Sequence, residues 1–353
     1  MKTIEQILEL AKWAPSGDNT QPWRFEIVNE NHVVVHGFDT RKDCVYDFLG
    51  HPSQISLGAL LENICIAASG HSLRTDITYR DADDEHPTFD VKFTRAQDTN
   101  PDPLIDCIPK RCVQRRPYST KLLAEAEKIE LVASLGPRHH VLWVEGLKGK
   151  LSMADILSKS GRLRLTIPEA YQVHRRIIQW RARFSEDRVP DKALGLDGAT
   201  LLLMRWVMGS WARVEFFNSF LGGTLLPRIE LDILPALGCA AHFAIVYDVK
   251  PQTIADYVLA GRALQRFWLT ATRLDLQLQP EMSPLIFHAY ATNSIPVSAR
   301  KGASAEARRI AAALDSIFSG SASNTVFMGR IGSGEMPSAR STRLPLDRLY
   351  QHS

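Results

Sequence analysis

The chain has 353 residues, of which 45% are hydrophobic and 23% are charged, and its formal net charge is +3. These fractions are typical of a globular protein and exclude wholesale disorder. The small positive charge gives no support for a nucleic-acid partner.

The cysteines and the apolar stretches indicate the compartment. There are five cysteines, an odd number with no C-x-x-C spacing, so we expect neither a disulfide framework nor a metal site. Acidic residues interrupt the apolar positions at the N-terminus, which argues against a signal peptide. The longest apolar stretches are too short to span a bilayer. The sequence thus predicts a cytoplasmic protein with no membrane contact.

In the first third of the chain, helices and strands alternate. The spacing of Ile4, Ile7 and Leu8 predicts a helix that ends at the turn formers of 15–19. A continuous apolar and small-residue run predicts a buried helix at 56–69. The other expected elements here are strands at 25–28, 33–35, 75–79 and 89–93, followed by a polar linker at 94–106.

A second unit is expected to begin near Pro109. Its most distinctive part is an insert at about 161–235, rich in Arg and Trp and mostly helical by pattern. The remaining expected elements are helices at 122–135, 254–274 and 303–317, strands at 140–144 and 243–247, a loop at 319–324, and a tail bearing Arg330, Arg340, Arg343 and Arg348.

One repeated residue pattern suggests an internal duplication. The segments 57–62 and 260–265 both have glycine at their second position, Gly58 and Gly261, and alanine recurs in register at Ala68 and Ala271. Each glycine would allow its helix to pack closely against a neighbour. We therefore expect two degenerate repeats, residues 1–108 and 109–353, the second carrying the insert.

The first segment whose residues suit ligand binding is the loop Pro15-Ser16-Gly17-Asp18-Asn19-Thr20-Gln21-Pro22-Trp23. It offers hydroxyl, amide and backbone donors beside a large aromatic side chain, which suits a polar planar ligand. The alternative is a plain helix stop, with the Trp23 ring filling the core.

Two further segments concentrate arginine: Arg111-Cys112-Val113-Gln114-Arg115-Arg116 and Arg340-Ser341-Thr342-Arg343-Leu344-Pro345. Guanidinium groups this close repel one another unless an anion neutralises them, and their forks match phosphate oxygens. The alternatives are a solvated basic turn and a loose basic terminus. No Walker loop and no G-x-G-x-x-G is present, so a nucleoside triphosphate or a Rossmann dinucleotide lacks its usual cradle.

Together these segments resemble the nitroreductase family of flavoproteins. That family has a Pro-Ser-x-x-Asn-x-Gln-Pro-Trp loop, matched at 15–23, and an Arg-x-Ser-x-Arg/Lys element, matched at 111–115 with Val113 in the hydroxyl position. A tail of the type Arg/Lys-x-x-Arg-x-Pro is matched at 340–345, and the family's central helix at 260–271. The resemblance covers the chain except for the insert.

The resemblance implies an α+β fold in which two degenerate repeats of mixed sheet and helices assemble one FMN site. The loop lies in the first half and the arginines in the second, an arrangement similar to the fused, pseudo-dimeric branch of the family. Arg115 is then expected near N1 and O2 of the flavin, where it would stabilise negative charge. The expected cofactor-binding residues are Pro15, Ser16, Asn19, Gln21, Arg111, Arg115, Pro280, Glu281, Met282, Arg340 and Arg343.

The implied activity is hydride transfer through FMN between NAD(P)H, or an organic substrate, and an acceptor. Two alternatives remain open: a biosynthetic dehydrogenase acting on a heterocycle, and a non-catalytic flavin-sequestering protein. We expect a small-molecule substrate and a monomer or homodimer. His174 and His242 are expected to be structural. The insert is expected to act as a lid, and six of its residues either line a substrate pocket or form a helix core: Trp180, Arg181, Arg183, Trp206, Trp211 and Arg213.

Overall fold

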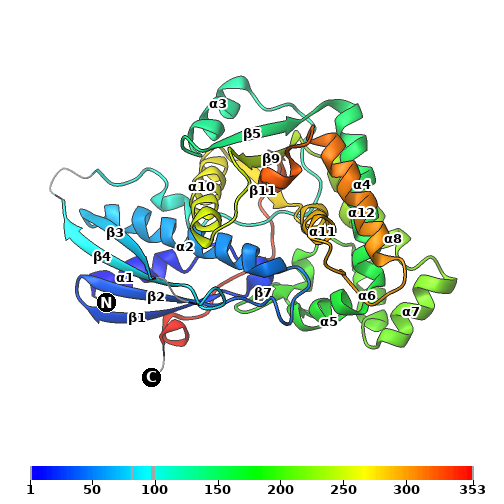
Figure 1. Ribbon diagram of the computed structural model, residues 1–353, viewed down its shortest axis with the longest axis horizontal. Coiled ribbons are helices and arrows are strands. Elements are labelled where there is room, and N and C mark those ends of the chain that lie inside the picture. Colours follow the sequence, from blue (N-terminus) through cyan, green and yellow to red (C-terminus); the bar gives the residue numbers. More distant parts are fainter. Residues whose placement is uncertain (1, 81–82, 97–99, 352–353) are drawn as a thin grey trace.

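A computed structural model describes residues 2–80, 83–96 and 100–351. The predicted α+β class is confirmed (Figure 1). The sequence predicted mixed sheets, whereas both four-stranded sheets are antiparallel throughout and only two short two-stranded ladders are parallel. None of the helices among the described residues has the length and apolarity needed to cross a membrane.

The first sheet has the strand order β1-β2-β4-β3. Its strands are β1 (Trp23–Asn29), β2 (His32–Gly37), β3 (Leu73–Arg80) and β4 (Thr88–Arg95). Alternate residues such as Val33, Val35 and Val91 pack on the helices α1 (Thr3–Ala11) and α2 (His51–Ser69). The residues between the packed ones are more exposed in β1, β3 and β4, as expected for a sheet with one covered face, whereas Val34 of β2 is also buried.

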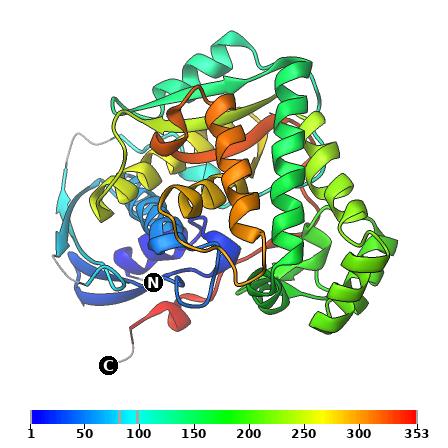
Figure 2. The ribbon, with the colours of Figure 1, turned by 45° about the vertical axis from the view of Figure 1, so that its right-hand side comes forward.

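The second sheet has the order β10-β11-β9-β5, with strands β5 (His139–Val144), β9 (Ala241–Tyr247), β10 (Leu276–Pro280) and β11 (Thr325–Ser333). Every residue of β9 is buried. Phe243 and Ile245 pack toward α3 (Glu125–Ala133) and α10 (Ile254–Arg273), whereas Ala244 and Val246 pack toward α4 (Gly146–Thr166), α11 (Ser283–Thr292) and α12 (Ala303–Ile317). Helices therefore cover both faces, and period-two alternation assigns the side chains to them (Figure 2).

Helices α2 and α10 cross between the two sheets (Figure 1). A Cβ on Gly58 would lie 2.0 Å from the Val258 carbonyl oxygen, and one on Gly261 would lie 2.0 Å from the Ile55 carbonyl oxygen. The close packing predicted for both glycines is confirmed. Polar contacts bind the same helices: Gln265 Nε2 donates to Asn63 Oδ1 at 2.6 Å, and Glu62 pairs with two α10 arginines. The duplication itself stays a prediction.

The insert is mostly helical, as predicted, but α4 begins at Gly146 and continues into it. The six Trp and Arg residues considered for a substrate pocket do not line the main cavity. Instead Trp180 and Trp211 pack around Tyr171, and Arg213 lies over the exposed Trp206 ring at 4.7 Å. The insert's elements are α5 (Pro168–Ile177), β6 (Ile178–Gln179), β7 (Phe184–Ser185), β8 (Val189–Pro190), α6 (Gly198–Val207), α7 (Trp211–Phe220), α8 (Leu225–Arg228) and α9 (Leu234–Leu237).

The last part of the chain differs from the expected tail. Residues up to 333 form β11, an internal strand of the second sheet, so Arg330 is fully buried. The chain then passes the insert, where β12 (Arg340–Ser341) pairs with β7, and returns to the first half, where Tyr350 forms a bridge with Phe25 of β1 (Figure 1). The boundary expected at residue 108 stays a prediction, and the linker at 94–106 lies partly outside the described residues.

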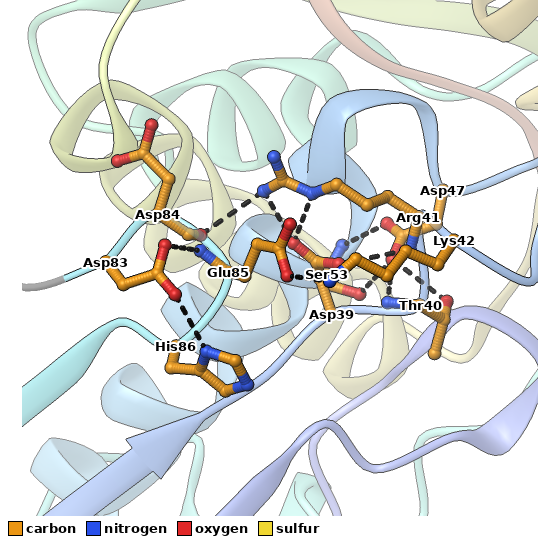
Figure 3. Close-up of polar contacts among 10 residues, drawn as sticks. All are labelled: Asp39, Thr40, Arg41, Lys42, Asp47, Ser53, Asp83, Asp84, Glu85 and His86. Atoms are coloured by element: carbon orange, nitrogen blue, oxygen red, sulfur yellow. Dashed lines mark hydrogen bonds and ion pairs between the residues drawn. The ribbon is translucent and has the colours of Figure 1, made fainter.

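A polar network fixes the connection between β2 and α2 (Figure 3). Asp47 accepts hydrogen bonds from both the backbone and the hydroxyl of Thr40 and of Ser53. Nearby, Asp83, Glu85 and His86 have potential ligand atoms within 4.8 Å of one another, but Glu85 pairs with Lys42 and His86 with Asp83. Within the same connection, Tyr46 hydrogen-bonds His174 of the insert, and the Asp43 carbonyl accepts from Arg176 of the insert.

Several single turns complete the structure. They are 3₁₀ turns at Gly17–Asn19, Phe48–Gly50, Ile105–Cys107, Asp191–Ala193, Ser321–Asn324 and Leu346–Leu349, and a π turn at Ile229–Ile233.

Candidate functional site

The loop after α1 has an unusual backbone. Asp18, Asn19 and Gln21 all have positive φ, at 53°, 62° and 49°. Non-glycine residues in this region cost free energy and persist where the surroundings hold them. Ser16 Oγ accepts from the Gln21 backbone at 3.0 Å, and the Trp23 ring at the start of β1 is fully buried. The loop therefore has a defined structure, and its Trp23 ring fills the core, which both the ligand-binding interpretation and the helix-stop alternative allow.

The amide side chains of this loop bind segments that are distant in sequence. Asn19 Nδ2 donates to the carbonyls of Glu186, in the insert, and Thr342, in the tail, while its Oδ1 accepts from Arg343 at 2.9 Å. Gln21 Nε2 donates to the same Glu186 carbonyl at 2.8 Å, and its Oε1 accepts from the Leu344 backbone. The side-chain amides of Asn19 and Gln21 thus connect the loop to the insert and to the tail.

A cavity of about 410 Å³ opens beside this junction, which is within the usual range for small-molecule and cofactor sites. Ten of the eleven residues predicted to bind the cofactor line it. They are Pro15, Ser16, Asn19, Arg111, Arg115, Pro280, Glu281, Met282, Arg340 and Arg343. The eleventh, Gln21, has no exposed surface and does not line the cavity, so its place is in the supporting structure.

Three arginines gather at one end of the cavity around Trp13. Arg111 Nη2 donates to the Trp13 carbonyl at 3.0 Å, and the guanidinium group lies 4.6 Å from the Trp268 ring. Arg340 lies 4.9 Å over the Trp13 ring and donates to the carbonyls of Pro109 and Arg111. Arg343 donates to the carbonyls of Trp13 and Ala14.

This arginine cluster (Arg111, Arg340 and Arg343) is not neutralised. In the stretches that the structure describes, no carboxylate oxygen lies within 4.0 Å of these guanidinium nitrogens. The buried Nε atoms of Arg111 and Arg340 have no hydrogen-bond partner. Burial, reinforced by the Arg340 charge, lowers the pKa of Arg111 to about 10, so this group stays charged at neutral pH, and burial also lowers the pKa of Arg340 and of Arg343. Buried cations in this state favour an anion.

Arg115 lies apart from the cluster on the cavity wall. Its Nη1 donates to the Ala193 carbonyl at 3.0 Å, the only hydrogen bond its guanidinium group makes within the described residues. Its own carbonyl accepts from the buried Arg330, which also donates to Gln279 and lies 4.0 Å over the Tyr118 ring. Arg330, expected in the tail, therefore holds the Arg115 backbone in place.

The wall between the two ends is largely apolar. Ile55 and Ala59 come from α2, Leu264 and Trp268 from α10, and Phe327 from β11. Glu281 also lies here, but its carboxylate is committed: Oε2 is 2.7 Å from His242 Nδ1, and both residues are buried. Burial is the largest single influence and lowers the pKa of His242, but the Glu281 charge and the hydrogen bonds with Cys239 and Glu281 together raise it to about 10. His242 is therefore part of a buried ion pair.

The insert supplies the opposite end of the cavity. His174 of α5 hydrogen-bonds the Tyr46 hydroxyl at 3.0 Å, and burial lowers the pKa of His174 to about 3, so the ring is neutral. Arg164 of α4 approaches Asp232 at 3.3 Å, and burial raises the pKa of Asp232 to about 6. Sequence reasoning singled out the loop that contains Asp18 but did not name Asp18 itself as a site residue. It missed Tyr46, Arg164 and Asp232, because nothing in their local spacing marks a site.

The comparisons with known proteins agree with the resemblance at the N-terminus. Residues 1–51, which contain the loop, match the Nitroreductase family. A relative from Mycobacterium tuberculosis (strain CDC 1551 / Oshkosh), "Uncharacterized protein MT1398", is 25% identical over 304 residues; the match covers 81% of this chain but only 39% of the relative. The structure of a nitroreductase-like family protein from Bacillus cereus is similar at 12% identity, with a TM-score of 0.37, over 71% of this chain and 96% of that one.

Proposed function

We propose that this nitroreductase-like chain is an FMN-dependent oxidoreductase that binds one flavin in the cavity between α2, α10 and the insert. The observation that carries the proposal is the arginine cluster at the end of a cofactor-sized cavity. Within the described residues its three arginines have no carboxylate partner, and two of them have buried Nε atoms with no hydrogen-bond partner. A phosphomonoester is the anion that suits it, because it brings close to two negative charges and several acceptor oxygens.

The rest of the cavity suits the remainder of FMN. The polar loop with Ser16 and Asn19 lies where a ribityl chain would need hydroxyl partners, and the apolar wall of α2 and α10 suits a planar ring. Bound FMN would supply hydride transfer between NAD(P)H, or an organic substrate, and an acceptor. Arg115 has unused donors that would stabilise negative charge on the ring. Ile177, Ile178 and Leu194 of the insert would exclude water.

The experiment is spectroscopic. The full chain is purified, its visible spectrum is recorded, and the FMN released by denaturation is measured against protein mass. We expect one FMN per chain, because the cavity has one arginine cluster and one loop. Two flavins per chain, or none after incubation with excess FMN, would contradict the proposal.

Anaerobic addition of NADPH then separates the candidate activities. Bleaching of the flavin spectrum supports an NAD(P)H-dependent reductase. A bound flavin that dithionite reduces and NADPH does not would support either the heterocycle dehydrogenase or the flavin-sequestering protein, and only the dehydrogenase would be reduced anaerobically by its substrate.

A further inference from the structure

Asp18 is placed in the cavity by the loop and is not used by the arginine cluster. Its neighbours Ser16, Gly17 and Asn19 also line the cavity, and its own φ of 53° lies in the left-handed region. Asp and Asn adopt this conformation more easily than other non-glycine residues. The loop is held by Gln21 and Asn19, so the position of the carboxyl group is set by contacts that do not involve the group itself.

The carboxyl group of Asp18 has almost no partner. Its one hydrogen-bond contact within the described residues is with the Cys44 thiol, at 4.0 Å from Sγ to Oδ2, and no cationic nitrogen lies within 4.0 Å. By contrast Asp47, three residues after Cys44, accepts four hydrogen bonds from Thr40 and Ser53. Asp47 is thus a structural carboxylate, whereas Asp18 is free to exchange a proton.

The surroundings of Asp18 raise the pKa of its carboxyl group toward neutral pH. Burial raises the pKa of Asp18 to about 6, while the more distant charges of Arg115, Arg176 and Arg164 lower it and Asp47 raises it again. Three further titratable groups at this end of the cavity are uncharged: burial keeps the Cys44 thiol and the Tyr46 hydroxyl protonated by raising their pKa, and keeps His174 neutral by lowering its pKa. Asp18 is therefore the group here that can both hold and release a proton.

Asp232, the other carboxyl group at this end, is placed differently. Its Oδ1 faces Arg164, and its Oδ2 is packed so closely against α4 that a Cβ on Gly161 would lie 1.9 Å away. Asp232 is therefore paired with Arg164 through one oxygen, and its other oxygen is buried without a partner among the described residues, whereas Asp18 has no cationic nitrogen within 4.0 Å.

We propose that Asp18 is the proton donor and acceptor for the substrate in this cavity. The inference rests on the proposed function, since a two-electron reduction by hydride needs one proton to complete it. When a quinone is reduced, the hydride brings both electrons from the nicotinamide through the flavin. The Asp18 O–H bond then breaks as a quinone oxygen gains its O–H bond, and water reprotonates the carboxylate. In the oxidative direction Asp18 accepts the proton that the substrate loses.

The test uses the FMN-loaded full chain, NADPH as reductant and two probes. Menadione, a quinone, takes two electrons with protons, whereas ferricyanide takes one electron and no proton. We expect Asp18→Asn to slow menadione reduction at least about tenfold, since positioned acids contribute roughly 10²–10⁴-fold, and to leave ferricyanide reduction unchanged. Asn suits the left-handed backbone, so the variant should fold. Asp43→Asn, an exposed change in the segment beside Cys44, is the matched control.

A second readout does not depend on turnover. Infrared difference spectra should show protonated-carboxyl absorption that disappears as the pH rises through about 6. Because Asp232 titrates in the same range, the signal of Asp18 is the part of this absorption that is lost in Asp18→Asn. The rate of menadione reduction should fall over the same range in the natural protein and stay flat in the variant. An equal loss with both probes, or an unchanged pH profile, would overturn the proposal. Failure to bind FMN would instead refute the proposed function, because it is measured before either probe is added.

Discussion

The Cα atoms of Gly58 and Gly261 face each other where α2 crosses α10: a Cβ built on either residue would lie 2.9 Å from the Cα of the other. The relationship is reciprocal, since each Cβ would also lie 2.0 Å from a carbonyl of the opposite helix, three residues before its glycine. The two halves of the chain pack on each other at this crossing. The close approach of α2 and α10 beside the cavity is possible because neither Gly58 nor Gly261 has a Cβ atom.

The first prediction concerns this crossing. Gly58→Ala and Gly261→Ala should each destabilise the fold by about 1–3 kcal/mol, because backbone must move to admit the methyl group and this outweighs the gain in helix propensity. Thermal and urea unfolding measure the effect. Gly198→Ala, at the exposed start of α6 with no atom within 4 Å of the new methyl group, is the control and should be close to neutral. Equal effects at all three positions would refute this explanation.

A second prediction concerns the junction at Asn19. Asn19→Ala removes hydrogen bonds to the insert, the tail and Arg343, so it should loosen residues 183–188 and 340–343 together. Hydrogen exchange should accelerate in both segments and in the loop, whereas the internal strand β9 should be unaffected. Faster exchange in the loop alone would mean that the Asn19 amide does not connect the segments.

Trp23→Ala should instead destabilise the whole fold by about 3–5 kcal/mol, because its ring is fully buried.

A third prediction concerns the buried pair of His242 and Glu281. The pKa of His242 is raised from 6.5 to about 10, so the folded state holds a proton that the unfolded state has lost between these values. The stabilisation is therefore complete below pH 6.5 and is lost as the pH rises through 10. Glu281→Gln should remove this dependence. Free energies of unfolding between pH 6 and 10 measure it, and parallel curves for the natural protein and the variant would contradict the assignment.

A fourth prediction concerns the effect of Asp18 on how the free energy of unfolding depends on pH. Its pKa is raised from 3.8 to about 6, so the folded state binds more protons than the unfolded state in that window, and stability falls as the pH rises through it. Asp18→Asn should therefore have little effect near pH 4 and stabilise the protein above pH 6, by on the order of 1–3 kcal/mol. A variant that is less stable than the natural protein at pH 8 would show that the carboxylate makes a contact needed by the fold.

The sequence was informative where local pattern and chemistry coincide. The strands of the first sheet, the buried α2 and the close packing at Gly58 and Gly261 could all be predicted, because periodicity and small residues reflect burial directly. The residues of the loop and of both arginine segments were found for a similar reason, since clustered cations and turn-forming amides stand out locally. Their assignment to a cofactor remains a prediction.

The parts that could not be predicted depend on distant contacts. Residues 325–333 contain two glycines and an arginine, which resemble a flexible tail until the neighbouring strands β9 and β10 are in place. Asp18, Arg164 and Asp232 become cavity residues only because the insert folds back over the first-half loop. The Trp and Arg residues of the insert were more conspicuous in the sequence, yet they pack among themselves or face solvent.

The most direct test of the central claim compares FMN with riboflavin, which lacks only the phosphate. If the arginine cluster binds phosphate, the natural chain should bind FMN at least about a hundredfold more tightly than riboflavin, since each charge-assisted contact contributes roughly 1.5–3 kcal/mol. Arg340→Gln should reduce that ratio about tenfold or more by weakening FMN binding alone, while Arg309→Gln on exposed α12 surface leaves it unchanged. Equal affinity for the two flavins, or a ratio that Arg340→Gln does not alter, would contradict the account.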